Sequence, residues 1–174
     1  VLGMDEMILR ESKESNIREY AMDIQNAGRT LLTIINDILD LNKIESGKME
    51  IVPVEYDVSS MIYDLTNMIK VRAEDKKLSF IVSVSPDIPA RLRGDDVRIR
   101  QILMNLLTNA VKYTQSGTVW FRVSLKAKED GENGENAVLH FEVEDTGIGI
   151  KPEDMSKLFS EFERIEVERN RNIE

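Results

Sequence analysis

The chain has 174 residues and a formal net charge of -9, with 23 Lys and Arg against 32 Asp and Glu, so nucleic-acid binding driven by overall charge is not expected. It contains no cysteine and one histidine, His140, which excludes disulfides, thiolate metal sites and a multi-histidine zinc centre. No apolar run approaches the roughly 20 residues that span a bilayer, so the sequence predicts a cytoplasmic chain, connected to a membrane only through upstream segments.

The first 47 residues have the periodicity of a helical hairpin. Residues 2–11 have the pattern of the end of one helix, and apolar residues then recur at alternating steps of three and four from Ile17 to Leu41. This spacing is the heptad seam of a coiled coil or helical bundle. A second apolar strip beside the seam predicts that two hairpins form a four-helix bundle in a homodimer. The alternative is that the long helix packs on its own globular domain.

Residues 48–174 combine strands and helices in mixed order. The pattern predicts strands over 49–54 and 78–84, helices over 57–75 and 95–114, a hairpin with strands at 119–125 and 137–143 and a connector at 129–136, and a short helix after Pro152. Such an order indicates an α+β sandwich with helices on one face of a mixed sheet.

The predicted helix 95–114 carries a polar stripe. At about 100° per residue, five side chains share one side of the helix: Arg98, Gln101, Asn105, Asn109 and Lys112. The opposite side is predicted to enter the core and holds Ile99, Ile102, Leu103, Leu106 and Ala110. A solvated face is the ordinary explanation, but asparagine is a mediocre helix former. Amide oxygens are suitable ligands for Mg²⁺, and a lysine one turn away can neutralise phosphate.

A second candidate feature follows the last predicted strand. Alternation places Asp145 on the inward side with Leu139, Phe141 and Val143. The next residues, 146–150, contain two glycines, which permit a tight turn or the close approach of a ligand to the backbone. A strand-ending turn with a capping aspartate explains these residues equally well. His140 falls on the other face and is expected to take no part in the site.

In this order, the motifs resemble those of sensor histidine kinases of two-component signalling. Residues 96–114 resemble the asparagine box, 145–150 the first glycine box and 158–164 the phenylalanine box of that family. Residues 1–47 resemble the dimerisation and histidine-phosphotransfer hairpin, and residues 48–174 resemble the ATP-binding catalytic domain.

The resemblance implies a Bergerat-type site for ATP and Mg²⁺. Asn109 would coordinate Mg²⁺ with support from Asn105, Lys112 would contact phosphate, Tyr113 would line the pocket, and Asp145 would accept the adenine amino group. The implied nucleotide-binding set also includes Gly147, Gly149, Ile150, Phe162 and Arg164.

The implied activity is ATP-dependent autophosphorylation on histidine, followed by phosphoryl relay to an aspartate in the receiver domain of a response regulator. Hydrolysing relatives carry a glutamate at the position of Asn105, and an amide lacks the basicity to activate water. Phosphoryl transfer is therefore favoured. The alternatives are a related Bergerat-fold ATPase and a degenerate dimeric signalling scaffold.

The resemblance also implies that this sequence is a fragment. The phosphoacceptor histidine is expected just upstream of Val1, and the second glycine box directly after Glu174. The sandwich is therefore expected to be incomplete at its C-terminus. We expect no autophosphorylation of this chain by itself, and weak or no affinity for ATP, because backbone donors to the phosphates are missing.

Overall fold

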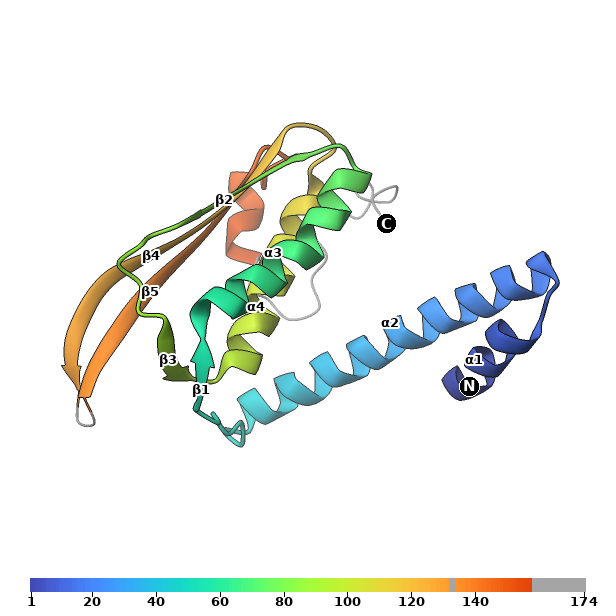
Figure 1. Cartoon of the computed structure of the whole chain (residues 1–174), viewed down its shortest axis with the longest axis horizontal. Helices are drawn as coiled ribbons and strands as arrows, with labels where there is room; N and C mark the ends of the chain where they lie inside the picture. Colours follow the sequence, from blue (N-terminus) through green and yellow to red (C-terminus); the bar gives the residue numbers. More distant parts are fainter. Residues whose placement is uncertain (132–133, 158–174) are drawn as a thin grey trace. The chain divides into compact units, whose positions relative to one another are not determined.

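The computed structural model describes residues 1–131 and 134–157. Contacts divide the chain into two compact units, Val1–Ile51 and Val52–Glu174 (Figure 1). The division falls shortly after Gly47, where the helical periodicity of the sequence ends. Among the described residues, no helix has the length and apolar character needed to cross a membrane.

The first unit is a hairpin of two helices, α1 (Leu2–Glu11) and α2 (Ser15–Glu45). Both helices were predicted from the apolar periodicity, and both are confirmed. The guanidinium of Arg18 donates to the carbonyl oxygen of Leu9, so α2 supplies a partner for the C-terminal end of α1. Helix α2 ends where Ser46 donates its backbone N–H to Asn42 and Gly47 adopts a φ of 65°.

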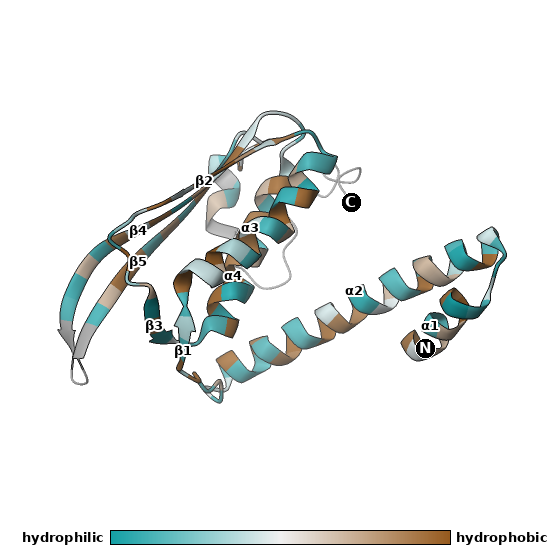
Figure 2. Ribbon diagram, viewed as in Figure 1, coloured by the Kyte–Doolittle hydropathy of each residue, from teal (hydrophilic) through white to brown (hydrophobic). Residues whose placement is uncertain are grey.

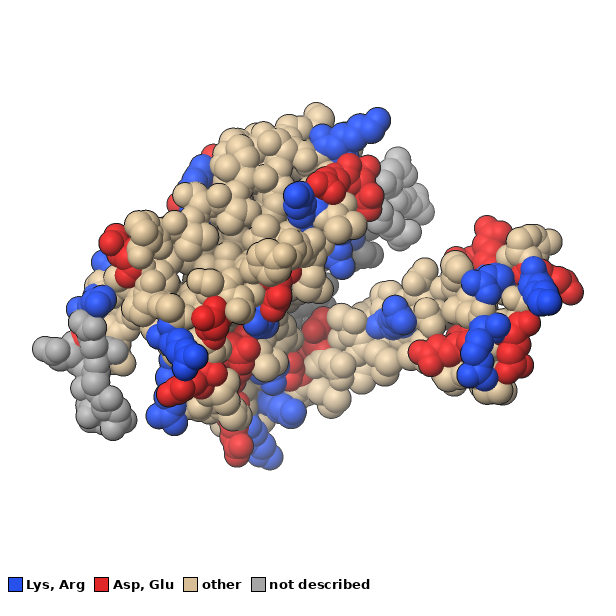
Figure 3. Space-filling model, viewed as in Figure 1, with Lys and Arg blue, Asp and Glu red and all other residues tan. Residues whose placement is uncertain are grey.

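The apolar seam of α2 remains on the surface of this unit. Its exposed members include Ile17, Tyr20, Ile24, Leu31, Ile34 and Ile38, whereas Ala21 is the buried residue of the helix. Figure 3 shows charged side chains gathered where α1 joins α2, while the visible middle of α2 is mostly uncharged. One hairpin alone therefore does not bury the seam, and apolar surface of this kind commonly marks an interaction site.

The described residues of the second unit form two sheets, two α-helices and a 3-10 helix (Figure 1). Strand β1 (Val54–Asp57) pairs antiparallel with β3 (Arg91–Gly94). Strand β4 (Thr118–Gly131) lies between β2 (Ser79–Val84), which is parallel to it, and β5 (Gly134–Asp145), which is antiparallel. The helices are α3 (Val58–Asp75) and α4 (Asp96–Tyr113), and a 3-10 helix, η1, covers Pro152–Lys157. The predicted α+β class and mixed sheet are confirmed.

The core lies between the two helices and one face of the three-stranded sheet. Brown and teal residues alternate along β4 and β5 in Figure 2, as expected for strands with one buried face. The largest fully buried apolar side chains come from α3, α4 and β4: Met61, Leu65, Ile69, Leu107, Val119, Phe121 and Val123. This core fixes α4 against the sheet and thereby positions the residues of its polar stripe.

The strands of this unit differ from the prediction in three ways. The first strand begins at Val54, where pairing with Gly94 starts, rather than at residue 49, and Pro53 has no N–H to extend the ladder. Strand β3 was not predicted, because the four-residue sequence from Arg91 to Gly94 has no apolar alternation. The predicted connector at 129–136 is mostly strand, since β4 runs to Gly131 and β5 begins at Gly134.

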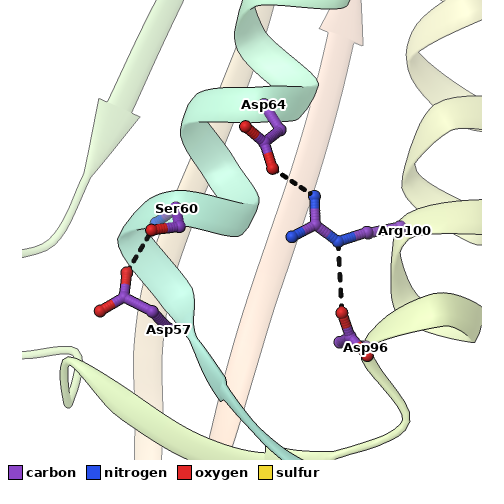
Figure 4. Close-up of polar contacts among 5 residues, drawn as sticks. All are labelled: Asp57, Ser60, Asp64, Asp96 and Arg100. Atoms are coloured by element: carbon purple, nitrogen blue, oxygen red, sulfur yellow. Dashed lines mark hydrogen bonds and ion pairs between the residues drawn. The ribbon is translucent and has the colours of Figure 1, made fainter.

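Both helices begin with an aspartate cap, and Figure 4 shows the cap of α3, Asp57. Asp57 accepts the backbone N–H of Ser60 at 2.7 Å. Asp95 accepts the N–H of Arg98 at 3.1 Å and also that of Val52 at 3.1 Å. These bonds satisfy donors that a helix start would otherwise leave unpaired.

An arginine joins the two helices near the same end. Arg100 of α4 contacts Asp64 of α3 at 3.0 Å and Asp96 of its own helix at 3.4 Å (Figure 4). All three side chains are at least partly exposed, so the pairs fix relative orientation more than they stabilise the fold.

The two caps predict a defined acid sensitivity. The backbone N–H of Ser60 holds the pKa of Asp57 below its usual value, and the N–H of Val52, followed by that of Arg98, does the same for the pKa of Asp95. A lowered folded-state pKa gives stability above the unfolded pKa of about 3.9 that is lost as the pH falls through the folded value. We expect the double variant Asp57→Asn, Asp95→Asn to match the wild type at neutral pH, because asparagine also caps helices.

Below about pH 4, the thermal midpoint of the double variant should fall less steeply than that of the wild type. Thermal unfolding followed by circular dichroism across this range provides the measurement. Asp75→Asn removes an exposed carboxylate that caps no helix start and is the control. If the thermal midpoints of the double variant and the wild type fell equally steeply as the pH was lowered, this prediction would be contradicted.

Candidate functional site

The polar stripe of α4 faces away from the core. Asn105 and Asn109 are exposed, and Lys112 is half-buried, while the helix buries Leu103, Leu107, Ala110 and Val111. Of the five residues predicted to share one side of the helix, Asn105 and Asn109 are thus exposed, and Arg98, Gln101 and Lys112 are partly buried. Within the stripe, Arg98 donates to the amide oxygen of Gln101 at 2.8 Å.

Two apolar residues predicted in the core are exposed instead. Ile102 is 60% and Leu106 49% exposed, although the prediction placed both on the buried side with Leu103. The sheet and α3 cover only the arc centred on Leu103 and Leu107, and residues that flank this arc stay outside. Ile102 and Leu106 thus border the asparagines with apolar surface.

Asp145 ends β5 on the predicted side, but it is not buried. Its register partner is Val119, which is fully buried, so the alternation was read correctly. Asp145 is nevertheless exposed, because it is the last residue of the strand and lies beyond the apolar layer. Its Oδ1 accepts the N–H of Gly147 at 2.8 Å.

The turn after β5 is attached to the end of α4. Ile148 donates its N–H to the carbonyl oxygen of Tyr113 at 3.3 Å. Gly147 lies so close that an added Cβ would be 2.5 Å from the same oxygen. Gly149 has a φ of 64°, and among the described residues other than its chain neighbours no atom lies within 4 Å of the place of a Cβ. The first glycine therefore serves packing against α4, and the second permits a left-handed turn.

Thr146 provides a second attachment for this turn. Its Oγ1 accepts the N–H of Thr118 at 3.0 Å, and its own N–H donates to the carbonyl of Thr118 at 3.1 Å. Gly117 lies against the same Thr146 side chain. This supporting role had one signal in the sequence, a hydroxyl residue directly after the strand-ending aspartate.

Two of the predicted site segments therefore come together in the structure. The last turns of α4 carry Asn109, Lys112 and Tyr113, and the Nζ of Lys112 lies 5.9 Å from the centre of the Tyr113 ring. The turn that follows Asp145 is bonded to the carbonyl of Tyr113. Ile150 is exposed at the end of this turn. Phe162 and Arg164 lie outside the described residues.

The single histidine lies away from this junction. His140 is exposed on β5 and pairs in register with Ser124, on the face opposite the core, as predicted. On that face Arg122 contacts Glu142 at 2.5 Å and Glu144 at 2.7 Å. Among residues 1–131 and 134–157, no group of three or more histidine, aspartate or glutamate side chains is placed to hold a metal ion.

Comparison with known proteins agrees with this arrangement. Residues 94–173 match the family described as histidine kinase-, DNA gyrase B-, and HSP90-like ATPases. The whole chain is 34% identical over 174 residues to hybrid signal transduction histidine kinase B of Dictyostelium discoideum. The chain belongs to the sensor histidine kinases.

Solved histidine kinase structures have the same fold. Full-length ShkA, in complex with AMPPNP, matches with a TM-score of 0.73 and 27% identity over 98% of this chain. Histidine kinase ThkA, in complex with response regulator protein TrrA, matches over 99% of the chain with a TM-score of 0.60 and 20% identity, and this second match concerns the fold alone.

This histidine kinase chain spans a small part of these relatives. It covers 9% of the Dictyostelium protein, 34% of ShkA and 49% of ThkA.

Proposed function

We propose that the chain is part of the catalytic core of a sensor histidine kinase, which uses ATP to phosphorylate a histidine of the whole protein. The observation that carries the proposal is the bond between Ile148 and Tyr113. It joins the turn after Asp145 to the end of α4, which carries Asn109 and Lys112. Because these reactions depend on ATP, we place this segment in the cytoplasm.

The residues at this junction have the chemistry that a magnesium nucleotide requires. Asn109 offers an exposed neutral oxygen ligand for Mg²⁺ with Asn105 one turn before it, and Lys112 offers a cation for phosphate. Asp145 has a carboxylate oxygen that can accept a hydrogen bond from an amino group, and Gly149 adopts a left-handed turn close to it in the chain. Bound ATP would supply the phosphoryl group, and Mg²⁺ would neutralise its charge.

The chain's own side chains favour transfer over hydrolysis. Asn105 lies on the exposed side of α4, one turn from Asn109. A carboxamide does not accept a proton from water at neutral pH, so it cannot serve as the general base that a hydrolase needs. In the proposal, Asn105 orients Asn109, Tyr113 lines the nucleotide site, and Lys112 neutralises the charge of the phosphates.

The helical unit supports the dimeric part of the proposal. The α2 seam leaves Ile24 47%, Leu31 58% and Ile34 49% exposed. A second copy of the hairpin would cover this surface in a four-helix bundle. The relation to histidine kinases then makes the receiver domain of a response regulator the proposed phosphoryl acceptor.

Phosphohistidine formation by the full gene product tests the function. Asn109→Asp would place a carboxylate beside phosphate, and Asp145→Asn would replace the charged carboxylate proposed to accept the adenine amino group with a neutral amide, whose NH2 group is a donor. We expect each to lower acid-labile labelling from radioactive ATP by roughly a hundredfold or more, without dissociating the dimer. Asn67→Asp and Asp75→Asn make the same charge changes at exposed positions of α3 and should label normally.

Normal labelling of both site variants would refute the residue roles. Release of free phosphate without phosphohistidine would instead identify an ATPase, and the absence of both would identify a scaffold.

A further inference from the structure

The C-terminal end of α4 is satisfied by groups from outside its own helical ladder. The last four carbonyls of a helix have no partner within it. In α4 each of these has a donor: Thr114 Oγ1 to Ala110 at 2.7 Å, Lys76 Nζ to Val111 at 3.0 Å and to Lys112 at 2.8 Å, and Ile148 N–H to Tyr113 at 3.3 Å. A single ammonium group therefore serves two of the four carbonyls.

Lys76 is held in place by the end of its own helix. It is the C-cap of α3, and Lys77 follows with a φ of 57°. Leu78 donates its N–H to the carbonyl of Ala73 at 2.9 Å, and both of these residues are buried. The backbone from which the Lys76 side chain projects is thus fixed by the core, although the side chain itself is exposed.

The two carbonyls that Lys76 holds lie beside the proposed nucleotide site. The first belongs to Val111 and the second to Lys112, and the next carbonyl along the chain, that of Tyr113, holds the turn after β5. A cation at a helix C-terminus also interacts favourably with the helix dipole. Movement at residues 111 and 112 would therefore be passed to the phosphate-facing lysine and to the turn.

We propose that Lys76 is a positioning residue of the nucleotide site, acting through the backbone of Val111 and Lys112 on the Lys112 side chain and on the turn at Gly147 to Gly149. The inference rests on the proposed function and adds to it a residue 36 positions before Lys112. The Nζ of Lys76 is already directed at two carbonyls, so its role is to hold α4 rather than to contact the nucleotide.

Replacing the ammonium group tests this role. In Lys76→Gln, we expect the Ile148 amide to exchange with solvent about fivefold faster than in the wild type, which corresponds to the loss of a cation at a helix terminus. The amide of Phe121, in the core of the sheet, should be unchanged. We expect the affinity of the full gene product for a magnesium complex of a nonhydrolysable ATP analogue to fall by a similar factor.

Two variants control the experiment. Lys77→Gln makes the same charge change one residue away and should leave both the amide exchange and the affinity at wild-type values. Lys76→Arg keeps a cation on a long side chain, so the Ile148 exchange rate and the nucleotide affinity should both be close to their wild-type values. Equal effects of Lys76→Gln and Lys77→Gln, or equal acceleration at Ile148 and Phe121, would overturn the positioning role.

The two measurements separate this inference from the proposed function. If the wild type binds nucleotide, but Lys76→Gln changes neither the exchange rate of the Ile148 amide nor the nucleotide affinity, only the role of Lys76 is overturned. If the wild-type gene product binds no nucleotide, the proposed function fails, and the role of Lys76 in a nucleotide site fails with it, whatever the amide shows.

Discussion

Replacing Gly147 with alanine is expected to release the turn after β5 from helix α4 and to remove nucleotide binding. The new Cβ would lie 2.5 Å from the carbonyl oxygen of Tyr113 and 2.9 Å from its carbonyl carbon. These are backbone atoms at a helix end fixed by the core, so they cannot turn aside as a flexible side chain would. Overpacking of this kind costs about 1–3 kcal/mol, and the bond from Ile148 to Tyr113 would be lost.

Gly94→Ala is the matched control in the same unit. The nearest atom to its Cβ would be a ring carbon of Tyr56 at 3.5 Å, an ordinary contact distance. Urea unfolding, amide exchange at Ile148 and titration of the full gene product with a nonhydrolysable ATP analogue should separate the two variants. Retained Ile148 protection and nucleotide affinity in Gly147→Ala would show that the close contact with Tyr113 is not needed.

Placing charges in the α2 seam is expected to convert a dimer into a monomer. Ile24 and Leu31 lie one heptad apart on the same side of the helix and are about half exposed in the single chain. In a four-helix bundle, Ile24→Asp with Leu31→Asp would bring carboxylates from both copies into an apolar interface, where unpaired charge is strongly unfavourable. Sedimentation or light scattering should then report the mass of one chain.

Asn26→Asp with Thr33→Asp adds the same charge to the opposite side of α2, where both residues are exposed. This control should keep the mass of the dimer. If the seam variant also keeps that mass, or if the wild type is monomeric at every accessible concentration, the bundle is not formed by this seam.

The predictable parts of the fold are those with a strong local period. The long run of three- and four-residue steps defined α2, and strict alternation defined the buried faces of β4 and β5. Strand β3 offered no such signal, because it has four residues and three of them are Arg91, Arg93 and Gly94. Its place is set by pairing with β1, which is a tertiary property.

The same distinction applies to the candidate site. The phase of α4 placed Asn105 and Asn109 correctly on its exposed side, since that depends only on helical geometry. At about 100° per residue, Ile102 lies closer to Asn109 than to Leu103 around the helix, so its exposure also follows from helical geometry. The exposure of Asp145 depends on how far the core extends past the end of β5, which no local pattern contains. The hydrogen bonds from Lys76 to the end of α4 join residues 35 and 36 positions apart in the chain. No local sequence pattern predicts contacts of this kind.

Mapping nucleotide binding onto the chain tests the central claim most directly. Backbone amide shifts would be followed by NMR during titration of the chain with Mg²⁺ and AMPPNP to millimolar concentration, where even weak binding is visible. We predict the largest shifts in the last turns of α4, at Asn109 to Tyr113, and in the turn from Asp145 to Ile150. Shifts confined to other elements would contradict the assignment of this junction as the nucleotide site.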